Sequence, residues 1–133
     1  MKTKGGKTRR NISGGRDIVT HLMTIRDQVK LYHWQTKQFA EHKATDDLLA
    51  SMDTNIDTFV ESYMGKYGRP SSVGSVKLHN YSPSNVRSFV KQESAWLSNV
   101  LPKKLGKGDT DLLNIRDNIL GDLSKTAYLF TLH

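Results

Sequence analysis

The chain lacks cysteine altogether, and proline and tryptophan are scarce. Its 133 residues include no Cys, three Pro and two Trp. The absence of cysteine excludes disulfide bonds and thiolate metal sites, so imidazole and carboxylate are the only strong metal ligands left. No apolar run approaches the roughly 18 residues that a membrane-spanning helix needs, and no hydrophobic segment follows the basic N-terminus to form a signal peptide. We therefore expect one soluble, unprocessed domain, for which the length is sufficient.

Acidic residues are missing from the first sixteen positions. This stretch holds six basic residues before Asp17, the first acid, so the rest of a chain with a total charge of +7 carries only +1. Together with its glycines, it predicts a disordered arm over residues 1–15 that contacts DNA or another polyanion, with binding that weakens steeply as salt rises. The candidate contacts are Lys2, Lys4, Lys7, Arg9 and Arg10. A solubilising or assembly tail is the alternative interpretation.

Apolar residues recur at helical spacing in two long segments that precede residue 64. The first stripe is Ile18, Leu22, Ile25, Val29 and Tyr32. The second is Leu48, Leu49, Met52, Ile56, Phe59, Val60 and Tyr63, beside an acidic line of Asp46, Asp53, Asp57 and Glu61. The start of the second helix is open, because Thr45 as N-cap would leave His42 in the preceding loop, whereas an earlier start would place His42 on the helix.

Glycine, proline and serine interrupt the helical pattern between residues 64 and 84. A connection of this length can carry the chain from one end of a bundle to the other, so the helices on either side of it can run parallel. A third helix is expected from Pro83 to Pro102 and a fourth from Asp109 or Thr110. The predicted fold is therefore all-α: a ferritin-like four-helix bundle over residues 16–133, with a long crossover between its second and third helices.

Five residues in the first two helices have the side chains that bind borderline divalent metals. They are His33, His42, Asp46, Asp57 and Glu61. Asp57 and Glu61 are four residues apart, so they project side by side from one helix face. A carboxylate pair beside two imidazoles would leave coordination positions open for water or an oxidant. A solvated acidic face and a core-edge histidine are the alternatives.

At these positions the chain resembles the mini-ferritins, the DNA-binding proteins from starved cells (Dps). That family has a His-Trp pair at the end of its first helix and a second histidine at the start of the next, with acids four, fifteen and nineteen residues further on. His33-Trp34 matches the first element, and Asp46, Asp57 and Glu61 keep these offsets from His42. The stretches "GKYGRP", "KGDTDLL" and "TAYLF" also resemble the family, so the likeness covers residues 16–132.

The resemblance implies a dodecameric shell that binds DNA and acts as a ferroxidase, in which peroxide or oxygen oxidises ferrous iron. The iron would lie between two subunits, with His33 and His42 from one, Asp57 and Glu61 from its neighbour, and Asp46 assisting. The implied location is cytoplasmic and nucleoid-associated.

Two departures from the family affect this interpretation. The family separates its two histidines by twelve residues, whereas here the spacing is nine. The loss either shortens the loop without consequence or moves one imidazole out of ligand reach. The connection between the third and fourth helices is also short. These differences resemble the ferritin-like proteins of large DNA viruses, which implies the alternative of a non-enzymatic structural or packaging protein in a virion, with capsid proteins as partners.

Glu93 lies within the apolar arc of the expected third helix. A buried carboxylate without a partner is costly, so we expect an inward Lys or Arg to pair with it, with a metal inside the bundle as the alternative. The remaining histidines, His21, His79 and His133, share no helix face and are expected to be structural or terminal. Trp34, Trp96 and Tyr128 are expected to anchor the core or an interface.

Overall fold

Four long helices make up most of the computed structural model, which describes the backbone of residues 2–132 and the side chains of residues 15–132. They are α1 (Lys2–Gln35), α2 (Phe39–Tyr67), α3 (Pro83–Ala95) and α4 (Thr110–Leu129). A π-helical turn, η1 (Trp96–Val100), and a 3-10 turn, η2 (Leu101–Lys104), extend α3. The all-helical prediction is confirmed, since no strand occurs in residues 2–132. None of the helices in this part of the chain is long and apolar enough to cross a membrane.

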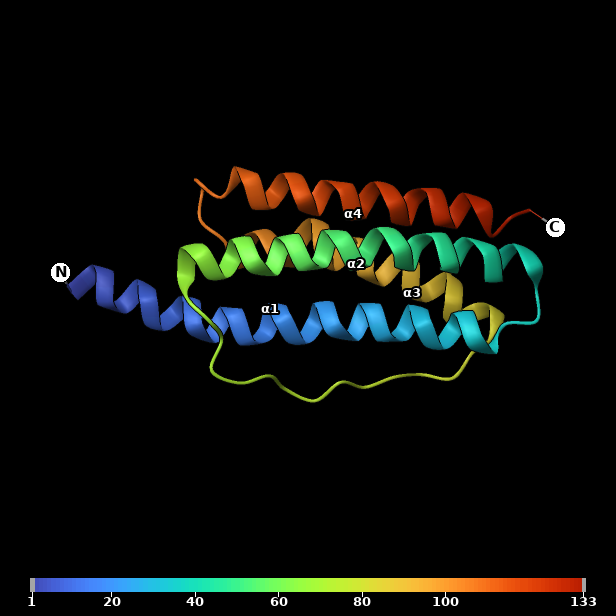
Figure 1. Ribbon diagram of the computed structural model, residues 1–133, viewed down its shortest axis with the longest axis horizontal. Coiled ribbons are helices and arrows are strands. Elements are labelled where there is room, and N and C mark those ends of the chain that lie inside the picture. Colours follow the sequence, from blue (N-terminus) through green and yellow to red (C-terminus); the bar gives the residue numbers. More distant parts are fainter. Residues whose placement is uncertain (1, 133) are drawn as a thin grey trace.

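The order of the helices in space follows from the long connection between α2 and α3. In Figure 1 α1 and α2 form an antiparallel hairpin, and the connection over residues 68–82 then runs along the length of the bundle beside α1. α3 consequently points in the same direction as α2, and α4 returns antiparallel to both. The bounds of α1 include residues 2–15, for which the sequence predicts a disordered arm; the side chains of residues 1–14, and with them Lys2, Lys4, Lys7, Arg9 and Arg10, lie outside the described part.

The two predicted apolar stripes form the core. All members of the α1 stripe and all of the α2 arc except the partly buried Val60 are buried, where they meet Val86, Leu97 and the α4 residues Leu112, Ile119 and Leu123. Burial of so many large side chains is the main stabilising contribution, at about 25 cal/mol per Å² of apolar surface.

Local sequence signals fix the ends of several helices. α2 begins at Phe39 with Gln38 as its N-cap, so His42 lies on the helix and Thr45 is not the cap. α2 stops at Gly68, whose φ of 88° suits glycine. α3 starts where predicted: Pro83 occupies the first turn, and the Ser82 side chain accepts a hydrogen bond from the Asn85 amide at 3.0 Å.

A row of polar side chains on α1 holds the crossover in place. Gln28, only 2% exposed, accepts from the His79 amide at 2.7 Å and donates to the His79 carbonyl at 2.8 Å. Thr20 accepts from the Gly74 amide at 2.8 Å, and Gln35 accepts from the Tyr81 amide at 2.7 Å. These side chains bond to an extended backbone that has no neighbouring strand, so they fix its position along α1.

A buried carboxylate joins the end of α2 to the start of α4. Asp109 accepts hydrogen bonds from the Gly106 amide at 2.7 Å, from the Lys66 ammonium at 2.9 Å and from the Tyr67 hydroxyl. Burial acts to raise the pKa of Asp109, but these three bonds outweigh it and hold that pKa below its usual value. The predicted start of the last helix at Asp109 or Thr110 is confirmed, and this network fixes it against α2.

Candidate metal centre

The corner between α1 and α2 brings two imidazole rings together. The rings of His33 and His42 stack with their centroids 4.0 Å apart and their planes 19° from parallel. His33 Nδ1 lies 3.0 Å from the His42 carbonyl oxygen, and His42 Nδ1 lies 3.1 Å from the His33 carbonyl oxygen. Each ring therefore bonds to the backbone of the other residue. The three-residue connection over 36–38 therefore keeps the two imidazoles together despite the spacing of nine, while their binding to one metal stays a prediction.

The hydrogen bonds of this histidine pair determine which ring nitrogens remain available. A carbonyl oxygen only accepts, so each Nδ1 must carry a proton and donate it. In the neutral ring the lone pair is then on Nε2, and among the described residues no hydrogen-bond partner reaches either Nε2. A ring nitrogen held this way by a carbonyl is the usual support of a metal-bound histidine. Each of the two stacked rings thus keeps one nitrogen, Nε2, as a potential ligand atom.

Thr45, which the sequence suggested only as a possible helix cap, supports the His33 ring instead. Its hydroxyl is 3.0 Å from His33 Nδ1 and bonds to the Glu41 carbonyl at 2.7 Å, and the residue is 3% exposed. A hydroxyl three residues after one histidine is too common a pattern to indicate this role, which depends on the fold bringing α1 beside α2.

The acidic candidates lie apart from the histidine pair within one chain. Asp46, Asp57 and Glu61 are all exposed on α2. Asp57 follows His42 by fifteen residues, which corresponds to about 22 Å along a helix. Over residues 15–132 no group of three or more His, Asp or Glu side chains is close enough to hold one metal ion. The structure thus joins His33 to His42 and separates both from Asp57 and Glu61.

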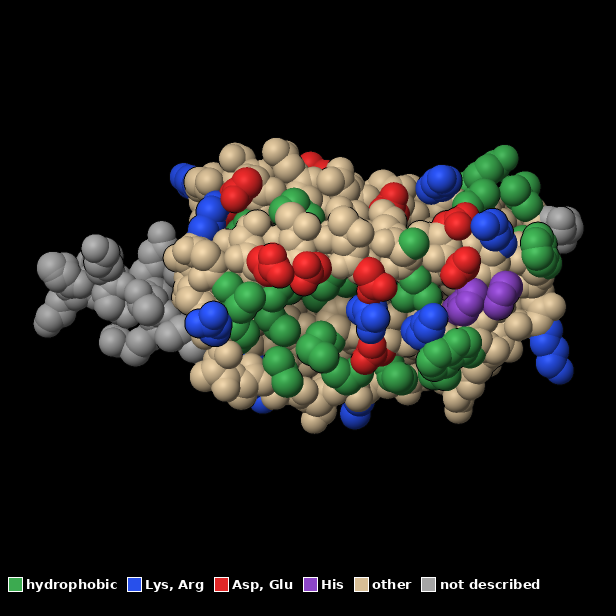
Figure 2. Space-filling model, viewed as in Figure 1, with side chains coloured by type: hydrophobic (Ala, Val, Ile, Leu, Met, Phe, Trp, Pro, Cys, Tyr) green, Lys and Arg blue, Asp and Glu red, His purple; other side chains and the backbone are tan. Residues whose placement is uncertain are grey.

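Histidines and carboxylates nevertheless share one surface. Figure 2 shows histidine side chains near one end of the face made by α1 and α2, with acidic and basic side chains in a row along it. An ion pair between Arg26 and Asp53 joins α1 to α2, and both residues line an open groove of about 550 Å³ that Asp57 also lines. Trp34, beside His33 in the sequence, is exposed, with the Lys30 ammonium 5.2 Å from its ring centroid.

Glu93 has a different partner from the one expected. It pairs with His21, whose Nε2 is 2.5 Å from the carboxylate, so the prediction of a Lys or Arg partner is wrong. The His21 ring also stacks on Trp96 at 3.7 Å. The sequence does not point to an imidazole, because His21 and Glu93 are 72 residues apart and on different helices. Within the described residues no third ligand joins them, and a metal inside the bundle gains no support.

Comparison with known sequences and structures identifies a protein family for the chain. No curated protein and no solved structure matches the chain. A family model described as a family of unknown function, DUF5856, matches residues 33–130, which include His33 and the whole of α2, α3 and α4. This match spans most of the bundle, and the chain therefore belongs to the DUF5856 family.

Proposed function

We propose that the protein is a Dps-like iron-binding ferroxidase that works as an oligomer and contacts DNA or another polyanion through its basic arm. The observation that carries the proposal is the stacked histidine pair, with both Nδ1 atoms engaged and both Nε2 atoms directed away from the backbone bonds. The parallel course of α2 and α3 and the full-length crossover support a bundle of the ferritin-like type.

A second copy of the chain would complete the ligand set. In a two-fold dimer, residue i of one copy meets residue j of the other, and j also meets i. His42 and Asp57 lie on one helix face on either side of exposed Ala50. A two-fold axis crossing α2 near Ala50 would therefore bring each histidine pair to the carboxylates of the other copy, twice per dimer. Ala50 is small enough for the two helices to approach closely there.

Imidazole nitrogens with carboxylate oxygens suit ferrous iron and stabilise the ferric product, because the carboxylates add negative charge as the metal gains positive charge. Iron is the substrate in this reaction. Two ferrous ions each lose one electron, and one peroxide accepts both electrons with two protons to give water. Asp46, one turn after His42, is placed to assist the histidine side of the site.

A coexpression experiment tests the shared site. His33→Gln/His42→Gln and Asp57→Asn/Glu61→Gln should each abolish the ferric absorbance that follows addition of ferrous iron and peroxide, whereas Asp47→Asn, an exposed acid on α2, should not. In a random mixture of the two inactive chains, half of the dimers are mixed and each has one intact site, so about one quarter of the wild-type activity should return. No recovery in a mixture that forms mixed dimers would refute a site shared between copies.

A second candidate is a structural or packaging protein without iron chemistry. It is favoured by large exposed aromatic side chains at one end of the bundle, since Phe39 is 76% exposed and Tyr128 is 62% exposed. Such residues often belong to interfaces. The wild-type protein would then assemble, or join a capsid, and would neither take up iron nor produce the ferric absorbance. Measurement of assembly mass with and without ferrous iron separates the two candidates.

A further inference from the structure

Charge is unevenly divided between the segments of the folded body. Residues 68–108, which comprise the crossover, α3 and the two short turns, contain seven basic residues and one acid, Glu93. The hairpin over residues 17–67 contains five basic residues and eight acids, and residues 109–132 contain two basic residues and four acids. Residues 68–108 therefore carry a strong excess of positive charge although the body as a whole is nearly neutral.

The basic residues of this segment are also mostly without acidic partners. They are Arg69, Lys77, Arg87, Lys91, Lys103, Lys104 and Lys107. Over residues 15–132 only Lys104 of this set forms an ion pair, with Asp17 at 3.6 Å. By contrast, Arg26, Lys43 and Lys66 in the hairpin each pair with an aspartate. The single acid of the basic segment is already paired with His21. The positive charge therefore remains available to an outside partner.

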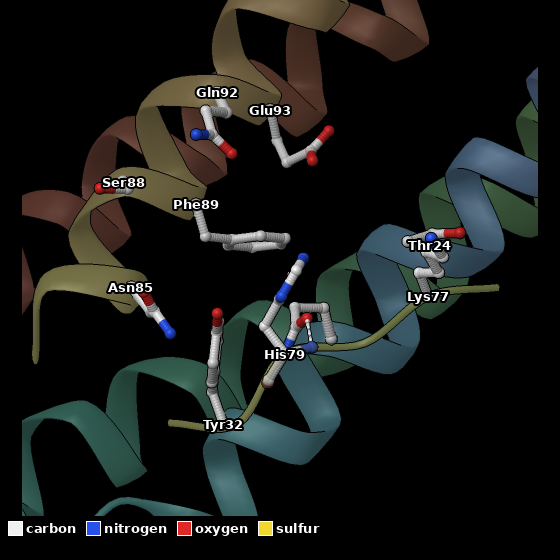
Figure 3. A pocket seen from close by; sticks show the side chains of 10 residues that line it. Thr24, Tyr32, Lys77, His79, Asn85, Ser88, Phe89, Gln92 and Glu93 are labelled. Carbon is white, nitrogen blue, oxygen red and sulfur yellow. Dashed lines mark hydrogen bonds between the residues drawn. The ribbon is translucent and has the colours of Figure 1, made fainter. Parts of the chain in front are cut away.

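Two adjoining cavities run along the inner side of the crossover. The first, about 480 Å³, lies between α1, the crossover and the turns after α3, and Arg16, Lys77 and Lys104 line it. The second, about 270 Å³, lies between α1, the crossover and α3. Figure 3 shows Asn85, Ser88, Gln92 and Glu93 on α3 around this second cavity, with His79 on the crossover pointing toward α3 and Lys77 beside Thr24. Thr24 and Lys77 border both cavities, so the two form one groove, here named the crossover groove.

We propose that the crossover groove and the basic residues around it bind the phosphate backbone of a nucleic acid, as a contact separate from the arm. Phosphate and sugar contacts are made by Lys and Arg together with hydroxyl and amide side chains. Such side chains line the groove, and its two acids, Asp17 and Glu93, are already paired with Lys104 and His21. Arg16 is both the last basic residue of the N-terminal run and part of the groove lining, so the arm leads directly into it. The inference is independent of iron chemistry and extends the polyanion binding proposed for the arm to the folded body.

The form of the basic segment favours a long polyanion. The crossover runs the length of the bundle (Figure 1), and Arg69 stands near its start, Lys77 in its middle and Arg87 just beyond its end. A linear chain of phosphates can meet charges spread in this way. Val73, Leu78 and Val100 are exposed among them, which are the side chains that an anionic membrane would use. Anionic vesicles therefore serve as the competing probe.

The test measures binding of a short labelled DNA duplex to the full chain by fluorescence anisotropy at several salt concentrations. Lys77→Gln/Lys103→Gln should lower the slope of log affinity against log salt by about two, one for each phosphate that is no longer neutralised. The control Lys37→Gln/Lys43→Gln removes the same charge from exposed lysines of the hairpin and should leave the slope unchanged. Ser75→Glu at the groove rim should weaken binding further, while Ser75→Gln should not. Circular dichroism confirms that each variant folds.

Deletion of residues 1–15 separates the groove from the arm. The shortened chain should keep a weaker, salt-dependent affinity that Lys77→Gln/Lys103→Gln then removes. Equal slopes for the groove variant and its hairpin control would overturn the proposal even if the arm binds DNA. Binding of anionic vesicles that depends on the same lysines, with unchanged DNA binding, would assign the groove to a membrane instead. Loss of all DNA binding when residues 1–15 are deleted would also overturn the groove contact. If the shortened chain keeps the full salt slope, the arm does not contact DNA.

Discussion

Asp109→Asn should be among the most destabilising single substitutions in the bundle. The carboxylate is 6% exposed and accepts from Gly106, Lys66 and Tyr67. An asparagine keeps one acceptor oxygen and places an amide group, itself a donor, where the second carboxylate oxygen accepted. Hydrogen bonds to a charged group contribute about 1.5–3 kcal/mol each, so the loss of one to two of them should cost about 3 kcal/mol. For a domain of this size that corresponds to a fall of about 10 °C in Tm.

The effect should depend on pH in a definite direction. The folded state lowers the pKa of Asp109, so its stabilising contribution is complete above the ordinary aspartate pKa and is lost as pH falls through the lowered value. The wild type should therefore lose more stability on acidification than Asp109→Asn does. Asp111 keeps a similar but exposed pair with Lys66 in both proteins, and the hydrogen bond from Lys66 lowers its pKa in the same direction.

Urea unfolding followed by circular dichroism measures both quantities, from neutral pH down to acid. Asp117→Asn, which removes an exposed carboxylate of α4, is the matched control and should change the free energy of unfolding by less than about 0.5 kcal/mol. If Asp109→Asn unfolds at the same urea concentration as this control, or loses stability in acid as steeply as the wild type, the network does not hold α4 in the manner described.

Three further substitutions test other parts of the structure. Thr45→Val removes the hydroxyl beside His33 Nδ1 and should weaken ferrous-iron affinity about tenfold in a titration, with Thr45→Ser as the retaining control; an unchanged affinity would show that the hydroxyl has no supporting role. Gln28→Leu leaves the His79 amide and carbonyl unpaired, so it should lower the free energy of unfolding by about 2 kcal/mol and speed hydrogen exchange of the His79 amide. Unchanged protection of that amide would show that Gln28 does not hold the crossover in place. Glu93→Gln should leave iron oxidation intact. Loss of oxidation in a folded variant would place the oxidation site inside the bundle, at Glu93.

The parts of the fold that depend on local pattern were predictable from the sequence. The α1 stripe and most of the α2 arc are buried as their spacing indicated, and Ser82 with Pro83 marks the start of α3. The π-helical turn was not predicted, because Pro102 suggested only a helix end, whereas α3 continues irregularly through Trp96–Val100. Such a turn depends on packing that residue spacing does not contain.

Contacts between distant residues were harder to predict. The sequence indicated that Glu93 needed a partner but not the right residue type, since the choice depends on the rotation of α1 against α3. The order of the candidate ligands along α2 was readable, while the stacking of His33 on His42 depends on the geometry of a three-residue turn. The hydrogen bonds between the Gln28 side chain and the His79 backbone had no sequence signal, because glutamine on a helix is usually solvent-exposed.

One of the hydrogen bonds that orient the two imidazoles also satisfies a carbonyl group at the end of α1. His33 is two residues from the end of α1, where carbonyl groups lack the amide that would follow in a longer helix, and the His42 ring supplies the missing donor. Folding alone thus gives a reason to retain both histidines, and a chain of this fold that binds no metal would also be expected to keep them. Asp57 and Glu61 are exposed and do not complete the end of a helix. Across the family, the presence of these two carboxylates, more than that of the histidines, is what should distinguish chains that bind metal from chains that only assemble.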